Sequence, residues 1–288
     1  TAEELQYNPV KLFFENCMKN KKNLPVTMFD KEENPYFVNE DEILNLLETF
    51  IGQAICSVIE GGKSAPLVNL MLNSQKNKIK SKILNFLHFF CQQWNDIKGG
   101  FGGFSVVSAE SWNAGTSDDG KIRYTGKLDC VLANSNGDTY IVDFKTGEPP
   151  SVKSCKISVD EETNKPVLFD FQIPMYIKIY NTGKSKLKQA QNASFCSISK
   201  EKHVVIVADP DIPFGKVSCS LDDYSETLCV FDEYAHVFKY KVDLFDFDPK
   251  SKKEDFYNFV DESKDCRECG YKSICRTTYS IRQRKLEK

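Results

Sequence analysis

The chain has 288 residues, of which 41% are hydrophobic and 27% are charged, a balance that allows a sizeable core and excludes a disordered or fibrous protein. The formal net charge of −3 is less basic than that of most dedicated duplex-DNA binders, so composition alone does not indicate a nucleic-acid partner. We expect no membrane span, no secretory signal and no disulfide framework among the eleven cysteines, and therefore a cytoplasmic protein in a reducing compartment.

Residues 1–98 have the pattern of a mostly helical lobe. Apolar residues recur at helical spacing from Glu42 to Glu60 and again from Gln75 to Trp94. The glycine-rich stretch Gly99 to Gly103 ends this part, and the hydrophobic period changes after it. We therefore expect a helical lobe over residues 1–98, followed in the same domain by a core with a C-terminal cysteine tail over residues 99–288.

The second part has the pattern of strands followed by alternating helices and strands. Strands are predicted at residues 104–108, 122–132 and 139–145, with the Asn136-Gly137 pair as a hairpin signal between the last two. A helix, a strand and a long amphipathic helix follow at residues 171–180, 203–208 and about 221–240. This order predicts an α/β core sheet flanked by helices and preceded by the helical lobe.

The segment Asp143-Phe144-Lys145 carries the first chemical signal. Alternate side chains of a strand share a face, so Asp143 and Lys145 point one way and Phe144 points into apolar surroundings on the other side. A carboxylate can hold a divalent cation, while a lysine beside it positions water or stabilises charge on a phosphate. Alone, such a pair is more typical of a solvated strand face.

A second carboxylate is needed for Mg²⁺, and Asp129 is the candidate. Directly paired residues of antiparallel strands share a face. A two-residue loop would pair Asp143 with Cys130 and turn Asp129 away, whereas a three-residue loop, Ser135 to Gly137, places Asp129 opposite Asp143. We therefore predict the three-residue loop, with Gly137 in the left-handed conformation.

Gln172 and Tyr176 lie one helical turn apart and so share a helix face. A glutamine and a tyrosine in this arrangement suit contact with a DNA phosphate or with a neighbouring catalytic group. The same spacing also fits an ordinary helix surface and the edge of a core.

Three segments in this order resemble the PD-(D/E)XK nuclease superfamily, in its RecB-type branch: Tyr124 to Asp129, Tyr140 to Gly147 and Phe171 to Tyr176. The resemblance implies a restriction-endonuclease-like core in which Asp129, Asp143 and the Phe144 carbonyl bind catalytic Mg²⁺ or Mn²⁺. It also implies that Lys145 is the catalytic lysine and that Gln172 and Tyr176 match the downstream motif. Glu110 stands where the family often has an acidic residue.

The likeness extends towards both ends of the chain, with departures. Leu5 to Phe14 is similar to the N-terminal entry of the family, and Phe245 to Pro249 is similar to the end of AddB-type nuclease domains. Cys56 occupies a position at which the family often has a histidine. His88 is either a substitute for that histidine or a helix-surface or core-edge residue.

Three cysteines close to one another, Cys266, Cys269 and Cys275, need an explanation. Thiolates suit Zn²⁺ and iron–sulfur centres, and the residues alone leave zinc, a cluster and no metal open. In the RecB-type branch such a tail closes a 4Fe–4S cluster with one cysteine near the N-terminus, and the resemblance implies the same here. Asn8 replaces the expected cysteine, so Cys17 is the candidate fourth ligand.

The leading hypothesis is a metal-dependent deoxyribonuclease, an exonuclease rather than an endonuclease, within an AddB-like helicase–nuclease that acts in double-strand-break repair. Its expected partners are single-stranded DNA and a helicase subunit. The alternative, motivated by Cys56 and Asn8, is a nuclease-fold module that has lost catalysis and serves in DNA binding or assembly. A zinc-stabilised interaction domain with an incidental Asp-x-Lys is a third interpretation.

Overall fold

The computed structural model describes residues 4–61, 66–95, 103–152, 158–159, 166–167, 170–182, 190–207 and 221–244. The chain divides into two compact units, Thr1–Tyr234 and Ala235–Lys288, and the elements below belong to the first unit except for the end of the last helix. No helix within the described residues is both long enough and apolar enough to cross a membrane.

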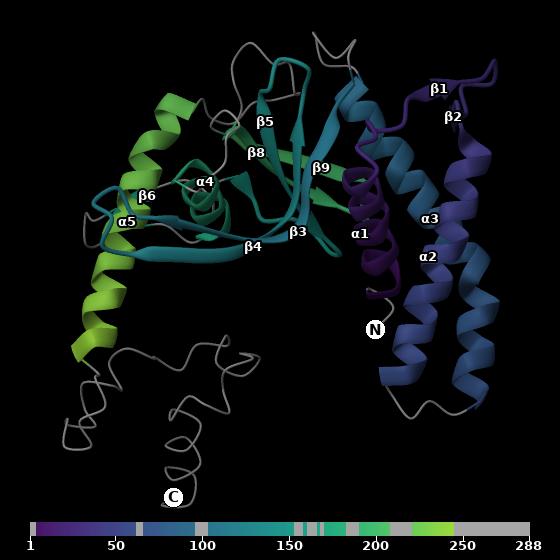
Figure 1. Cartoon of the computed structure of the whole chain (residues 1–288), viewed down its shortest axis with the longest axis horizontal. Helices are drawn as coiled ribbons and strands as arrows, with labels where there is room; N and C mark the ends of the chain where they lie inside the picture. The colour runs from purple at the N-terminus through teal and green to yellow at the C-terminus, as the bar shows by residue number, and fades with distance from the viewer. Residues whose placement is uncertain are drawn as a thin grey trace, which may run out of the picture. The chain divides into compact units, whose positions relative to one another are not determined.

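A five-stranded mixed sheet forms the centre of the first unit (Figure 1). In spatial order its strands are β3 (Ser105–Thr116), β4 (Arg123–Ala133), β5 (Thr139–Lys145), β8 (Ala190–Ser197) and β9 (Lys202–Val207). Neighbouring strands are antiparallel, except that β5 and β8 are parallel. Parallel strands need a long crossover, and the connection between β5 and β8 contains helix α4 (Gln172–Thr182).

Three N-terminal helices lie on one side of this sheet: α1 (Glu4–Lys19), α2 (Glu40–Gly61) and α3 (Pro66–Asn95), with α2 packed on α1 and α3. Phe144 of β5 anchors the contact, because three phenylalanine rings of α1 and α3 lie around it. The ring-centroid distances are 4.9 Å, 5.5 Å and 5.9 Å, to Phe14, Phe90 and Phe86. Tyr140 and Val142 belong to the same hydrophobic cluster, so the alternation of β5 turns Asp143 to the opposite face.

Helix α4 packs on that opposite face, together with α5 (Leu221–Leu244), through Ile173, Ile177 and Tyr224. Gly115 of β3 allows the close approach of α4, since a Cβ atom there would lie 2.7 Å from the Ile179 Cα. The helix is therefore held close over the strands that carry the candidate site.

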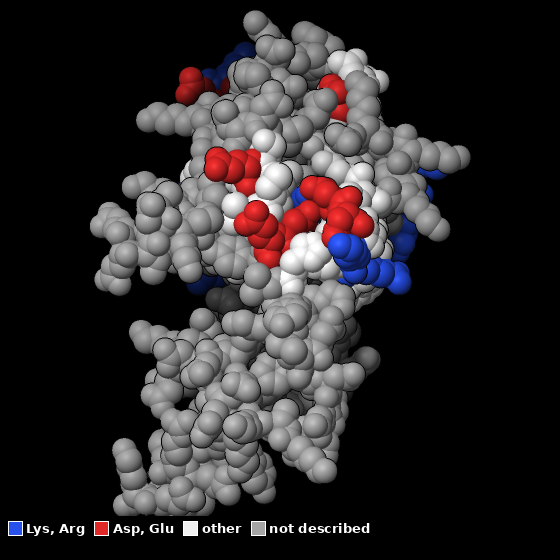
Figure 2. Space-filling view, turned by 90° about the vertical axis from the view of Figure 1, so that its left-hand side faces the viewer, with Lys and Arg blue, Asp and Glu red and all other residues white. Residues whose placement is uncertain are grey.

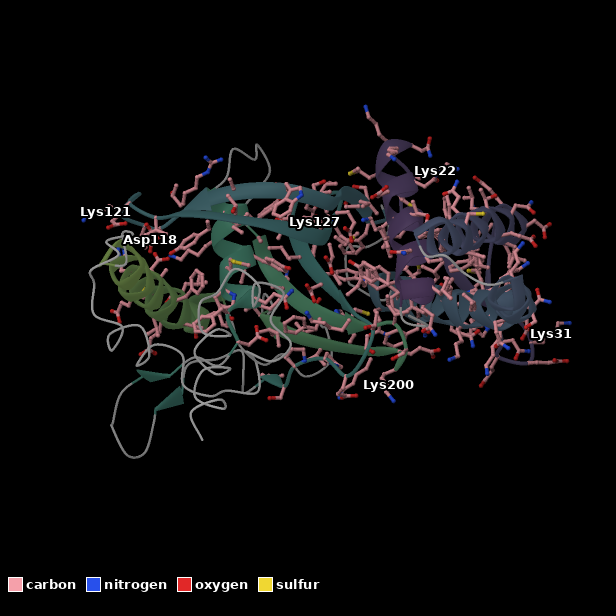
Figure 3. The ribbon with its side chains drawn as sticks, turned by 90° about the horizontal axis from the view of Figure 1, so that it is seen from below. Lys22, Lys31, Asp118, Lys121, Lys127 and Lys200 are labelled. Carbon is pink, nitrogen blue, oxygen red and sulfur yellow. The ribbon has the colours of Figure 1, made fainter. Side chains whose placement is uncertain are left out.

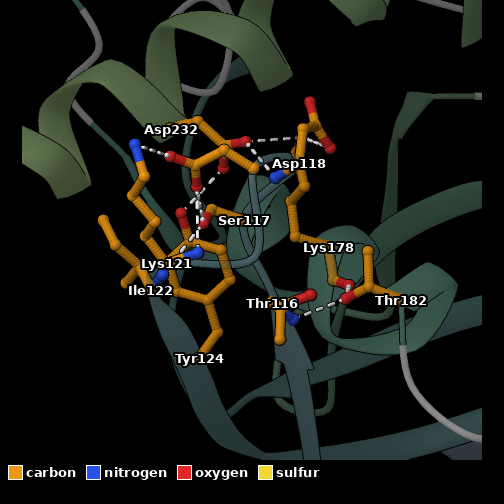
Figure 4. Close-up of polar contacts among 10 residues, drawn as sticks. Thr116, Ser117, Asp118, Lys121, Ile122, Tyr124, Lys178, Thr182 and Asp232 are labelled. Atoms are coloured by element: carbon orange, nitrogen blue, oxygen red, sulfur yellow. Dashed lines mark hydrogen bonds and ion pairs between the residues drawn. The ribbon is translucent and has the colours of Figure 1, made fainter.

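A polar network ties α4 to the β3–β4 turn and to α5 (Figure 4). The Lys178 ammonium lies 2.7 Å from Asp118 Oδ1 and 3.0 Å from Asp232 Oδ2, and the Tyr124 hydroxyl donates to Asp232 Oδ1 over 2.7 Å. Burial opposes the charge of Lys178, but the two carboxylates outweigh it and raise the lysine pKa. The network locks three elements together by charge.

The mixed α/β architecture and the order of the main elements are as predicted, with some differences. Strand β3 extends to Thr116, and α3 begins at Pro66. Four short strands and one central strand were not predicted: β1 (Thr27–Phe29), β2 (Pro35–Phe37), β6 (Ser158–Val159), β7 (Pro166–Val167) and β8.

Strand β8 escaped prediction because its buried residues include several polar ones. The Ser194 hydroxyl lies 2.8 Å from His203 Nε2, and the Ser197 hydroxyl donates to the Gly147 carbonyl over 2.7 Å. A hydrophobic pattern does not count such satisfied polar groups as core.

Candidate active site

The β4–β5 hairpin has the predicted register and loop. Cys130 pairs with Val142, and the same register places Asp129 opposite Asp143. The Asn134 N–H donates to the Asp138 carbonyl over 3.1 Å, which leaves three loop residues between them. Gly137 has a φ of 77°, the left-handed conformation that favours glycine. The predicted opposition of the two aspartates is confirmed.

The two aspartates lie in buried surroundings at the point where β4 and β5 stop pairing through their backbones. Asp129 Oδ2 accepts a hydrogen bond from the Phe144 N–H at 2.9 Å. Burial and the neighbouring Asp143 carboxylate raise the pKa of Asp129 to about 7. Burial also raises the pKa of Asp143, against the opposing effect of Lys145. The positive charge near the two aspartates is therefore not enough to stabilise both of them in the ionised form.

The other predicted site residues converge on Asp143. Lys145 Nζ lies 2.7 Å from Asp143 Oδ2 and donates to Gln172 Oε1 over 2.6 Å. Gln172 Nε2 donates to Asp143 Oδ1 over 2.6 Å and to the Tyr176 hydroxyl over 2.8 Å. Asp170 accepts from the Gln172 N–H at the start of α4 and so caps the helix. The strand face and the helix face thus meet at one network.

Glu110 lies in the same row, on β3. Ala109 pairs with Cys130 and Ser111 with Leu128, so the register places Glu110 opposite Asp129. Three acidic residues therefore occupy matching positions on three adjacent strands. Glu110 has a φ of 50°, which is uncommon for a residue other than glycine.

Three partners of Glu110 were not predicted as members of the site. The Tyr7 hydroxyl donates to Glu110 Oε1 over 2.6 Å, Lys11 Nζ lies 3.0 Å from Oε2, and Lys127 also pairs with Oε2. Burial opposes ionisation of Glu110, but these donors prevail and lower its pKa. Tyr7 belongs to the segment Leu5 to Phe14, which resembles the N-terminal entry of the family. This resemblance is the signal from which Tyr7 could have been predicted as a site residue.

The remaining candidates lie apart from this network. Cys17 is 5% exposed within the hydrophobic cluster of the helical lobe, and burial raises its pKa to about 12. His88 is buried, with its ring stacked on Phe37 at a centroid distance of 4.0 Å. Of its two interpretations, this position agrees with the packing residue and not with a substitute for the family histidine. Cys56 is exposed on α2. Cys266, Cys269 and Cys275 lie outside the described residues.

The donor set of Asp129 and Asp143 fits Mg²⁺ or Mn²⁺. Among the described residues no three His, Cys, Asp or Glu side chains form a preformed metal site. Mg²⁺ is usually held by only one or two carboxylates, together with water and substrate phosphate. Asp143 Oδ2 is buried without a hydrogen bond, and its contact with Lys145 is ionic. A divalent cation would satisfy this oxygen and relieve the repulsion that raises the Asp129 pKa.

This carboxylate–lysine row on a helix-flanked mixed sheet is an arrangement suited to the hydrolysis of phosphodiesters. The chain matches the PD-(D/E)XK nuclease superfamily over residues 45–276, which is most of its length, and it belongs to that superfamily. Members of the superfamily are generally nucleases, so the match supports nuclease-type activity and DNA binding. A comparison with curated proteins finds no match.

Proposed function

We propose that the chain is a divalent-metal-dependent deoxyribonuclease whose metal ligands are Asp129, Asp143 and the Phe144 carbonyl. The observation that carries the proposal is the convergence of Asp129, Asp143 and Lys145 on one sheet face in the register needed for a shared site. When bound there, the metal would polarise the scissile phosphate and lower the pKa of a bound water.

Lys145 is the proposed catalytic lysine, placed to stabilise negative charge on the phosphate. Its ammonium is held by Asp143 and Gln172 and lies 5.0 Å from the centre of the Phe195 ring. Gln172 acts as a positioning residue, since it holds both charged groups and is itself held by Tyr176. Helix α4 thereby orients the side chains of Asp143 and Lys145.

We further propose an exonuclease of the RecB/AddB type that acts on single-stranded DNA with a helicase subunit in double-strand-break repair in the cytoplasm. The order of the three motifs supports this assignment. In it, residues 1–98 are the helical lobe and residues 99–288 the nuclease core with its cysteine tail.

The 4Fe–4S cluster is proposed because the tail with Cys266, Cys269 and Cys275 resembles that of the RecB-type branch. As the fourth ligand Cys17 does not fit well, because its apolar surroundings favour the neutral thiol over the thiolate that ligation requires. Iron analysis of anaerobically purified wild type and of Cys17→Ser tests both points. Protein without iron excludes the cluster, and a variant with full iron excludes Cys17 as its ligand.

Cleavage of end-labelled single-stranded DNA with Mg²⁺ or Mn²⁺ tests the nuclease proposal. Lys145→Ala and Asp143→Ala should each lower the rate by roughly 100-fold or more. Lys31→Ala is the matched control, since Lys31 is an exposed lysine on the β1–β2 turn, well away from Lys127 of the strand that carries Asp129 (Figure 3). Full activity in the Lys145 variant refutes the site. DNA binding without cutting by the wild type would favour the catalytically degenerate module.

A further inference from the structure

We propose that Trp112 and Lys127, which face each other across β3 and β4, hold one unpaired nucleotide of the DNA strand beside the candidate active site. Trp112 stacks on the base, and Lys127 contacts a phosphate. The inference rests on the proposed function, because it names the form of DNA that the site takes and a residue that selects it.

Trp112 has an unusual exposure for its place in the fold. It lies within the 12-residue strand β3 but is 76% exposed, and it belongs to neither hydrophobic cluster of the described residues. Trp94, by contrast, is buried. Burying a large ring is normally favourable, so an indole left in water suits a surface that is covered by a ligand. Exposed aromatic rings on which bases stack are a common feature of single-strand binders.

The position of Trp112 relative to the carboxylates favours a nucleotide as that ligand. Trp112 pairs directly with Lys127, so the two side chains project from the same face. Lys127 is two residues from Asp129 on β4, a separation of about 7 Å along a strand. A single nucleotide can therefore extend from the carboxylate row to the indole ring.

The charges around Glu110 supply a phosphate contact. Lys11 and Lys127 both pair with its carboxylate, which is 5% exposed, whereas the lysine side chains are 27% and 35% exposed. Two ammonium groups share this one carboxylate, so Glu110 does not depend on Lys127 alone. Lys127 can therefore turn to a phosphate while Lys11 and Tyr7 continue to hold Glu110.

Other charges limit the path of the strand. Figure 3 shows Lys127 on β4 between α1 and the hairpin turn that carries Asp118 and Lys121. Acidic side chains gather on the side of the first unit seen in Figure 2. Among the side chains that the structure describes, the exposed acids of the hairpin turn and α5 are Asp118, Asp119, Glu226 and Glu233. Asp118 and Asp119 are paired with Lys178 and Lys121, so the repulsion of phosphate on this side comes from Glu226 and Glu233, and it disfavours a DNA path along α5.

Binding of a fluorescent oligothymidylate in EDTA, measured by anisotropy, tests the inference without cleavage. Trp112→Ala should weaken single-strand binding by roughly 5- to 150-fold, and Trp112→Phe should retain most of the affinity. Lys127→Gln should reduce the slope of log affinity against log salt by about 0.7. Binding should also quench the indole emission of Trp112, and this quenching should be absent in Trp112→Phe.

Val38→Ala is the matched control for Trp112, because Val38 is 72% exposed on a different part of the chain. Unchanged single-strand affinity in Trp112→Ala overturns the inference, as does an equal loss of affinity for duplex and single-stranded DNA. Lys145→Ala separates the two proposals, since it should lose cleavage and keep Trp112-dependent binding. If cleavage and single-strand binding depend on Lys145 but not on Trp112, the nuclease proposal stands and the proposal that Trp112 stacks on a base is wrong.

Discussion

Replacing Asp129 with asparagine should abolish metal-dependent cleavage and make the metal-free protein more stable. Burial and the Asp143 carboxylate raise the pKa of Asp129 to about 7 from its ordinary 3.8. At about 1.4 kcal/mol for each pH unit, the ionised group costs the folded state at most about 4 kcal/mol. Asparagine removes the charge and keeps an oxygen for the Phe144 N–H. Since Asp143 remains buried, we expect a gain of about 1 to 3 kcal/mol.

Thermal unfolding of wild type and Asp129→Asn in EDTA measures this gain, as a rise in Tm of roughly 2 to 12 °C at pH 8. The folded pKa is raised, so the wild-type cost is absent below about pH 4 and grows until pH 7. The difference in Tm should follow that window. Mg²⁺ should stabilise the wild type and leave the variant unchanged. A variant less stable than the wild type at pH 8 would refute the reasoning that burial and the Asp143 carboxylate make the ionised Asp129 costly to the folded state.

Two further variants test the polar contacts around α4. Gln172→Ala should lower kcat about 100-fold with little change in KM, because Asp143 and Lys145 each lose a short hydrogen bond. Single-turnover cleavage measures the loss of rate. A change in KM alone would contradict a positioning role for Gln172. Lys178→Met should destabilise the fold by about 3 kcal/mol in urea unfolding, since it leaves the buried Asp232 carboxylate without its cation. Lys121→Met is its control, and equal stabilities of the two variants would show that the network does not stabilise the fold.

The short-range geometry of the site could be predicted from the sequence because it follows from strand periodicity. One loop length decides whether Asp129 faces Asp143, and the requirement for a second carboxylate selected the loop that the structure has. The one-turn spacing of Gln172 and Tyr176 likewise placed both on one helix face. Such relations depend on residues within a hairpin or a helical turn.

The contacts of Glu110 could not be predicted in this way, because they join segments far apart in the chain. Tyr7 and Lys11 reach Glu110 from α1, across about a hundred residues of sequence. The exposed Trp112 lies in a strand whose predicted end fell at Ser108, since the alternation of apolar residues ends there. The left-handed φ of Glu110 also breaks the pattern on which strand prediction depends.

The apolar contacts that stabilise β5 lie on the sheet face opposite to Asp143 and Lys145. Asp143 and Lys145 flank Phe144, whose ring packs among Phe14, Phe86 and Phe90. Burial of such a ring contributes about 1.5 to 3 kcal/mol, and each aromatic contact about 0.5 to 1.5 kcal/mol more. That core fixes the backbone of β5. The side chains of Asp143 and Lys145 are therefore held in place even though the Asp129 and Asp143 carboxylates repel each other. This arrangement explains why removing a carboxylate should abolish activity without displacing the strand: its position is set by the phenylalanine cluster and not by the polar network.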